Sequence, residues 1–137
     1  MESAQRESVV SAVEAQMRSF EAAERDLDAD RALSHFAAVP DFHVYNDGRL
    51  LTYEQVAAAV RGGFPKVRSM ATPFTNLRVL VLCAESALVS ATLHRAVTDS
   101  AGTVTRSQGA ATWLFRKIDG QWLIVYGQLD HRPETGA

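Results

Sequence analysis

The chain is poor in cysteine and proline, and its apolar runs are short. Its single cysteine, Cys83, rules out a disulfide within the chain. Cys83 lies in the apolar run VLVLCAE, with no base or positive charge nearby, which predicts a small buried side chain rather than a reactive thiol. Every apolar run ends well short of the ~20 residues that a membrane-spanning helix needs. We therefore expect no membrane partner.

The chain also has little excess of charge of either sign. The formal net charge is -2 and charged residues make up 22% of the chain, which is ordinary for a globular protein. Nucleic acids and anionic membranes select basic surfaces, so neither is an expected partner. The first residues, MESAQRES, are polar where a signal peptide would be apolar. These features predict a cytoplasmic protein.

No motif for a metal or a cofactor stands out. The four histidines, at positions 35, 43, 94 and 131, do not show the spacing of zinc ligands. In the one adjacent carboxylate–histidine pair, Asp130-His131, the two side chains would leave a strand on opposite faces. Gly62-Gly63 follows an expected helix, whereas a phosphate-binding loop precedes one. We expect no metal and no cofactor.

The first half of the chain shows helical periodicity. Apolar residues recur at intervals of three and four between residues 2 and 24, as on one face of a long amphipathic helix: Val10, Val13, Met17 and Phe20. A short helix burying Leu33 and Phe36 is expected to follow and to end before Pro40. A third helix begins at Thr52, where Gln55 completes a capping box, and ends at Gly62-Gly63.

Strand periodicity dominates the second half. One strand is expected earlier, over DFHVYNDGRLLT, with Asn46-Asp47-Gly48 as its turn. Residues 64–74 contain two prolines and predict a connection or an irregular sheet edge. From Leu77 onward long strands follow one another, and Gly109 within them suggests a bulge or a bend. The order of elements predicts an α+β fold in a single domain over residues 1–137, with helices on one face of a single sheet.

A C-terminal hairpin is the clearest local feature. Asp119-Gly120 separates two apolar runs of strand length, which predicts antiparallel pairing. Strict alternation along the second run would place its apolar start and its polar end on one face: Trp122, Ile124, Tyr126, Gln128 and Asp130. Such a gradient suits a strand that leaves a core to line a pocket, and it equally suits a strand whose end reaches solvent.

The whole pattern resembles the nuclear transport factor 2-like superfamily, in particular its SnoaL-like and ketosteroid-isomerase-like branch. The resemblance rests on residues 23–37, AERDLDADRALSHFA, on residues 40–56, PDFHVYNDGRLLTYEQV, and above all on residues 112–131, TWLFRKIDGQWLIVYGQLDH. It implies a cone, in which a strongly curved, mostly antiparallel sheet wraps the long N-terminal helix. It also implies an apolar cavity that opens at one end, and a homodimer formed through the sheet.

The resemblance also suggests which residues meet a ligand. Tyr126, Gln128 and Asp130 occupy places where many relatives carry a His-x-His-x-Ser-like series, so they would point into the cone. The three groups that ketosteroid isomerases use align with Phe20, Asn46 and Ala111, and none of these supplies the required chemistry. The resemblance therefore does not extend to that isomerase mechanism.

A different acid–base pair would draw on His94 and Asp130, or on His43 and His131, with Tyr45 or Tyr126 as partner. His94 shares its expected strand face with Leu88, Ser90, Thr92 and Ala96, which suits a pocket wall or a dimer surface. Residues predicted to contact the ligand are Phe20, Tyr45, Trp113, Tyr126 and Gln128. Those predicted to act as acid or base are His94 and Asp130.

Two functional hypotheses stand at this point. The first is a non-catalytic module that binds a small hydrophobic molecule in the cone and dimerises through the sheet. The alternative is an isomerase, cyclase or dehydratase that moves protons on a carbonyl-bearing substrate of polyketide-like or steroid-like shape. Because the isomerase groups are absent, the first hypothesis is favoured.

Overall fold

The protein was analysed as a computed structural model, which describes residues 1–134. Its N-terminal helix α1 spans Ser3–Arg25 and buries one stripe, as predicted. The stripe begins at Val9 rather than at Val10, and it continues through Val13, Met17 and Phe20. One position on it carries a charge, since Glu24 is also buried.

Two shorter helices complete the helical layer. Helix α2 (Ala29–Leu33) begins after Asp28, whose side chain accepts a hydrogen bond from the backbone N–H of Arg31. Helix α3 (Tyr53–Gly63) begins with the predicted capping box, in which the side chains of Thr52 and Gln55 each accept from the other's backbone N–H. The 3-10 turn η1 (Phe64–Lys66) follows directly.

The strands form one eight-stranded sheet. Their bounds are β1 (His43–Asn46), β2 (Arg49–Leu51), β3 (Val67–Ala71), β4 (Phe74–Cys83), β5 (Ser86–Asp99), β6 (Val104–Ile118), β7 (Gln121–Leu129) and β8 (Arg132–Pro133). The main order is β2-β1-β7-β6-β5-β3, while β4 also pairs with β5 and β8 with β6. Only the β1–β7 pairing is parallel among the strands described.

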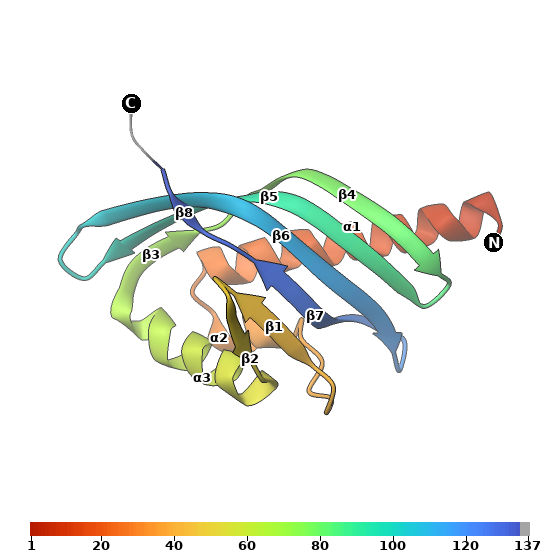
Figure 1. Cartoon of the computed structure of the whole chain (residues 1–137), viewed down its shortest axis with the longest axis horizontal. Coiled ribbons are helices and arrows are strands. Elements are labelled where there is room, and N and C mark those ends of the chain that lie inside the picture. The colour runs from red at the N-terminus through yellow and green to blue at the C-terminus, as the bar shows by residue number, and fades with distance from the viewer. Residues whose placement is uncertain (135–137) are drawn as a thin grey trace.

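The long strands curve over α1, which lies against the inner side of the sheet (Figure 1). Helix α3 lies across one end of this half-open cone, beside the short β1–β2 hairpin (Figure 1). The predicted C-terminal hairpin is confirmed, with β6 and β7 paired antiparallel around Asp119-Gly120. The predicted α+β cone is likewise confirmed.

The prediction for the faces of β7 is wrong at its C-terminal half. Cross-strand pairing moves from Phe115↔Ile124 to Leu114↔Tyr126, so Val125 is an extra residue in a bulge. Because side chains alternate, one extra residue exchanges the faces of everything beyond it. Tyr126, Gln128 and Asp130 therefore do not share the face of Trp122 and Ile124.

Two other local predictions need correction. Gly109 stays in regular register with Leu93 of β5, and its missing side chain instead makes room for the backbone of Asp130, which lies against it. Cys83 is exposed, not buried, because it lies at the end of the edge strand β4, next to the turn into β5. Its Sγ lies 3.4 Å from Ser86 Oγ, and this hydrogen bond lowers the pKa of the thiol.

The segment 64–74, expected as a connection or an irregular edge, contains the edge strand β3. It pairs with β5 through a register shift between Val67 and Ser69. Within residues 1–134, no helix is both long and apolar enough to cross a membrane. The same residues contain no group of three or more His, Cys, Asp or Glu side chains suited to a metal ion.

Candidate ligand-binding cavity

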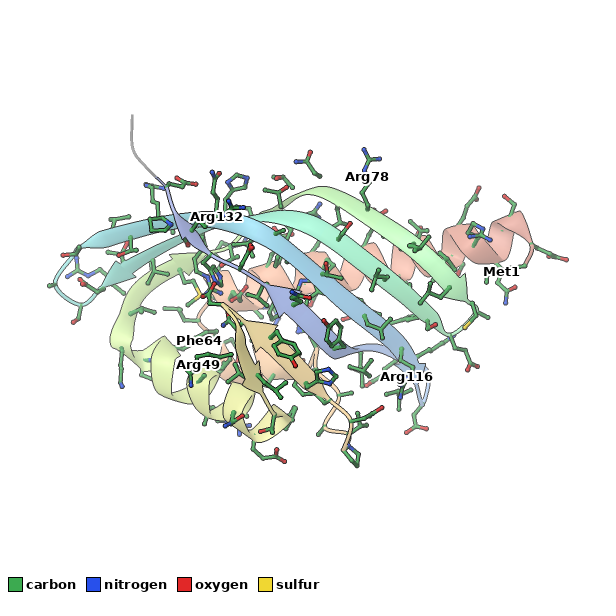
Figure 2. The ribbon with its side chains drawn as sticks, in the orientation of Figure 1. Met1, Arg49, Phe64, Arg78, Arg116 and Arg132 are labelled. Carbon is green, nitrogen blue, oxygen red and sulfur yellow. The ribbon has the colours of Figure 1, made fainter. Side chains whose placement is uncertain are left out.

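A cavity of about 290 Å³ lies between the inner face of the sheet and the helices. Residues of α1, α2, α3, β1 and the long strands line it: Phe20, Glu24, Ala32, Phe36, Val44, Asn46, Leu51, Val56, Ala59, Val60, Gly63, Phe64, Val67, Met70, Arg95, Trp113 and Leu129. Most of this lining is apolar, which is typical of pockets for small molecules. Phe64 is buried on the inner side of the sheet, beside α3 (Figure 2).

The cavity opens past α3. Ala59 is exposed although it belongs to the lining, and Leu51, Val60 and Val67 are half-buried. These residues come from β2, α3 and β3, so the mouth lies where these elements meet.

Aromatic rings form the inner end of the cavity. The ring of Phe20 lies edge-on to Phe36 and to Trp113, with centroids 5.4 Å and 6.1 Å away. Trp113 pairs across the sheet with Gly127, and the indole covers the place where a side chain at position 127 would be. The pair Trp113 and Gly127 thus sets the depth of the cavity.

One ion pair lies in the wall, with Glu24 buried and Arg95 partly exposed. Glu24 is only 5% exposed, and its Oε2 accepts a hydrogen bond of 3.2 Å from Arg95 Nη2. Arg95 also donates from Nε to Thr72 Oγ1 at 3.2 Å. Glu24 Oε1 has no hydrogen-bond partner among the described residues. The guanidinium of Arg95 therefore satisfies one oxygen of the carboxyl group and leaves the other free.

Burial governs the ionisation of this group. Removal from water raises the pKa of Glu24, because a charged carboxylate is poorly solvated in the wall. The positive charge of Arg95 opposes the rise, and the neighbouring Glu21 adds to it. The net direction is upward, so Glu24 holds a proton at pH values where an exposed glutamate has lost it.

Two further polar atoms of the lining residues are buried and lack a partner within residues 1–134. They are Asn46 Oδ1, at the end of β1, and Trp113 Nε1. Buried polar groups are nearly always hydrogen-bonded, and an unsatisfied one costs about 1–3 kcal/mol. With Glu24 Oε1, three such atoms belong to residues that line this one cavity.

The structure brings only part of the predicted ligand-contact set to this cavity. Phe20 and Trp113 line it. Tyr45, Tyr126 and Gln128 lie on the outer face of the sheet, where Tyr126 donates to Gln128 Oε1 and His43 lies between the two tyrosines. The predicted direction of Tyr126 and Gln128 into the cone is wrong because of the bulge at Val125. Tyr45, predicted as a ligand contact, lies on β1 and is also outside the cavity.

Asp130, predicted as an acid or base, has a structural contact instead. Its Oδ1 accepts a hydrogen bond of 2.8 Å from the backbone N–H of Ala110, and Asp130 lines an outer hollow of about 320 Å³ with Tyr45 and Gln128. The neighbouring His131 turns to Asp47, with Nδ1 and Oδ2 3.0 Å apart.

His94, the other predicted acid or base, also lies outside the cavity. Its ring faces Glu134 at 3.6 Å, in a separate hollow that Arg106 lines. His94 shares a strand face with Ser90 and Thr92, as predicted, and the structure shows that this is the outer face of the sheet. The structure therefore does not bring His94, Asp130 and the cavity together.

Sequence reasoning missed Glu24 and Arg95, although both carry a readable signal. Glu24 follows Phe20 by four residues and so continues the apolar stripe of α1 as a charged member. Arg95 is in phase with Val89 and Leu93 on the buried face of β5. A charge placed in phase with an apolar face is the pattern that would have found both.

Of the three positions that align with the ketosteroid-isomerase groups, Phe20 and Asn46 line the cavity, and Ala111 is buried on the inner face of β6.

Comparisons with known proteins agree with this architecture. The profile of the SnoaL-like domain matches residues 13–129. No curated protein matches the chain. A protein from Novosphingobium aromaticivorans proposed to be a scytalone dehydratase superposes with a TM-score of 0.86 at 15% identity, covering 96% of this chain and 89% of that one.

Two other solved structures show the same fold. A nuclear transport factor 2-like superfamily protein from Salmonella enterica serovar Typhimurium gives a TM-score of 0.82 at 14% identity, covering 96% of each chain. A hexachlorocyclohexane dehydrochlorinase gives 0.81 at 13% identity, covering 99% of this chain and 95% of that one. With the curved sheet, the long helix and the profile match in agreement, this chain belongs to the SnoaL-like domain family and has the nuclear transport factor 2-like fold.

Proposed function

We propose that this protein binds a small, largely apolar molecule in the cavity of its cone. The observation that carries the proposal is the cavity itself, which combines an apolar lining with buried polar atoms that lack partners. A ligand with an apolar body and one polar end fits both properties. A fully charged ligand does not fit, because the lining offers it little compensation for lost water.

The mouth of the cavity provides the test. Ala59→Trp places a large ring at the entrance, whereas Ala58→Trp adds the same ring one position away, on an exposed residue outside the lining. We expect neutral bicyclic aromatic compounds such as 2-methoxynaphthalene to bind the wild type and Ala58→Trp, and to lose affinity for Ala59→Trp. Isothermal titration calorimetry measures the dissociation constants. Equal affinity for the two variants would place any binding outside the cone.

A second candidate function is proton transfer on a bound carbonyl compound. One observation favours it: Glu24 is a cavity carboxyl group whose pKa is raised, as suits a general base. The dehydratase and dehydrochlorinase among the structural relatives share only the fold with this chain. In this candidate Glu24 takes the role that was predicted for His94 and Asp130.

Deuterium exchange tests this second candidate without a known substrate. In 2-tetralone a base removes a proton from the carbon next to the carbonyl group. The enolate then takes a deuteron from D2O, or from the base after the base has exchanged that proton with D2O. We expect the wild type to accelerate this exchange, followed by NMR, and Glu24→Gln to abolish the acceleration. Exchange that survives in Glu24→Gln would remove the carboxyl group from the reaction.

We also propose that the protein forms a homodimer through the outer face of the sheet. Aligned residues of neighbouring strands give this face an apolar row, Leu80, Leu88, Leu114 and Tyr126. Leu80 and the nearby Leu82 are 58% and 54% exposed in the single chain. A second copy related by a two-fold axis would present the same row and cover it. The cytoplasmic location stays a prediction.

A further inference from the structure

Beside the main cavity lies a smaller hollow of about 40 Å³. The two spaces share five lining residues, namely Phe20, Glu24, Arg95, Trp113 and Leu129. The smaller hollow therefore adjoins the cavity, and Glu24 lines both spaces. A space this small is above the ~10–15 Å³ that holds one water-sized group, and it is too small for a ring.

The residues around the smaller hollow have complementary hydrogen-bonding needs. Glu24 Oε1 is an acceptor without a partner, and Trp113 Nε1 is a donor without one, among the residues described. The two side chains are 5% and 4% exposed, so bulk water reaches neither. Arg95 makes no hydrogen bond to Oε1, since its Nη2 donates to Oε2 and its Nε donates to Thr72.

The chemistry of the missing partner follows from this pair. A hydroxyl group is both a donor and an acceptor through a single oxygen, so it offers the donor that Glu24 Oε1 lacks and the acceptor that Trp113 Nε1 lacks. A carbonyl or ether oxygen accepts from Trp113 but gives nothing to an ionised Glu24. If Glu24 is protonated, the same hydroxyl oxygen can accept from it.

We propose that the smaller hollow receives the hydroxyl group of the ligand, held between Glu24 and Trp113, so that the cavity selects neutral hydroxylated ring compounds. This inference rests on the proposed function, because it places the apolar body of the ligand in the main cavity. Glu24 is then the residue that determines specificity, and Arg95 positions its carboxyl group.

A matched pair of probes tests the inference. 2-Naphthol and 2-methoxynaphthalene have the same ring system, and a methyl group replaces the hydroxyl proton in the second. We expect 2-naphthol to bind the wild type roughly tenfold more tightly or better, since a hydrogen bond to a charged group is lost in the ether. Calorimetry gives both dissociation constants.

Two variants test whether the preference for 2-naphthol comes from the carboxyl group of Glu24. Glu24→Met combined with Arg95→Met removes the ion pair as a unit, which leaves no unpaired buried charge. We expect the two probes to bind this variant about equally. In Trp113→Phe both probes lose the same donor, so the preference for 2-naphthol should remain.

A second measurement needs no variant. 2-Naphthol becomes a strong acid in its excited state and passes its proton to an adjacent carboxylate, after which it emits at the longer wavelength of the naphtholate. We expect naphtholate emission from the bound probe to appear as pH rises and Glu24 loses its proton, with excitation where tryptophan does not absorb. Emission from the neutral form only, at every pH at which the protein is folded, would overturn the inference.

The outcomes separate the two proposals. Equal binding of the two probes by the wild type would overturn the hydroxyl inference and leave cavity binding intact, as expected if a lone water bridges Glu24 and Trp113. Failure of both probes to bind would overturn the proposed function and the inference with it.

Discussion

Glu24 shows how one side chain couples the stability of this protein to its site. A carboxyl group on the apolar stripe of α1 loses its hydration on folding, and a single hydrogen bond from Arg95 offsets only part of that loss. A leucine at this position would pack without that cost. Glu24 thus lowers the stability of the fold at the place where it supplies the cavity with a polar atom.

Because the pKa of Glu24 is raised, the loss of stability caused by burying this group depends on pH, and the sign of that dependence is definite. The unfolded chain releases the Glu24 proton near the ordinary pKa of 4.5, whereas the folded chain still holds this proton at higher pH. The contribution of Glu24 to stability is therefore complete below 4.5 and is lost as pH rises toward the folded pKa. The charged groups that act on it are Arg95 from β5 and Glu21 from its own helix.

We expect Glu24→Gln to remove this pH dependence. As pH rises from 4.5 toward the folded pKa of Glu24, the free energy of unfolding of the wild type should fall relative to that of Glu24→Gln, because only the wild type releases this proton on unfolding. Urea denaturation at a series of pH values measures both. The exposed Glu14→Gln on the same helix is the control and should follow the wild type. Parallel curves for wild type and Glu24→Gln would contradict the raised pKa.

At the scale of elements, the meeting of β6 and β7 shapes the cavity. After the bulge at Val125, Gly127 and Leu129 point inward, and Gly127 lies opposite Trp113. Since glycine has no side chain, the indole lies flat over β7 and leaves the cavity open in front of it. A side chain at position 127 and the indole of Trp113 would occupy the same space.

We expect Gly127→Ala to lower the free energy of unfolding by about 1–3 kcal/mol, the usual cost of an overpacked core. The new methyl group would push Trp113 into the cavity, so affinity for 2-methoxynaphthalene should fall as well. Urea denaturation and calorimetry provide the two readings. Gly62→Ala in α3 is the control, because a methyl group there meets no neighbouring atom. A stable Gly127→Ala with unchanged affinity would show that the indole does not need this space.

At the scale of the whole molecule, the sheet has two unlike faces. The inner face packs on α1 and encloses the cavity, while the outer face carries the apolar row from Leu80 to Tyr126. Arg78 on β4 projects away from the sheet and marks a polar border of that row (Figure 2). Dimerisation through the outer face would leave the mouth beside α3 free.

We expect the wild type to have twice the mass of the 15.0 kDa chain in solution. Ser90→Arg, next to the apolar row on β5, should yield the mass of one chain, because a buried unpaired charge is costly. Light scattering after size-exclusion chromatography measures the mass. Ser8→Arg, on an exposed position of α1, is the control. A dimer that survives Ser90→Arg would show that the interface lies elsewhere.

The sequence by itself determined the class and most of the elements of this fold. Local signals are sufficient for the stripe on α1, the capping box of Thr52 and the turn at Asp119-Gly120, because each depends on neighbours a few residues apart. Phe20 and Trp113 were predicted in the ligand-contact set, and both line the cavity, since large aromatic residues on buried faces have few other places to lie.

Only the tertiary structure decided which polar groups meet the cavity. A single extra residue at Val125 turned Tyr126, Gln128 and Asp130 outward, and no local pattern announces such a bulge. The partners of the ion pair, Glu24 and Arg95, are far apart in the chain and meet only because β5 crosses α1 inside the cone. Strand faces and long-range pairs depend on register, which is a property of the assembled sheet and not of any one segment.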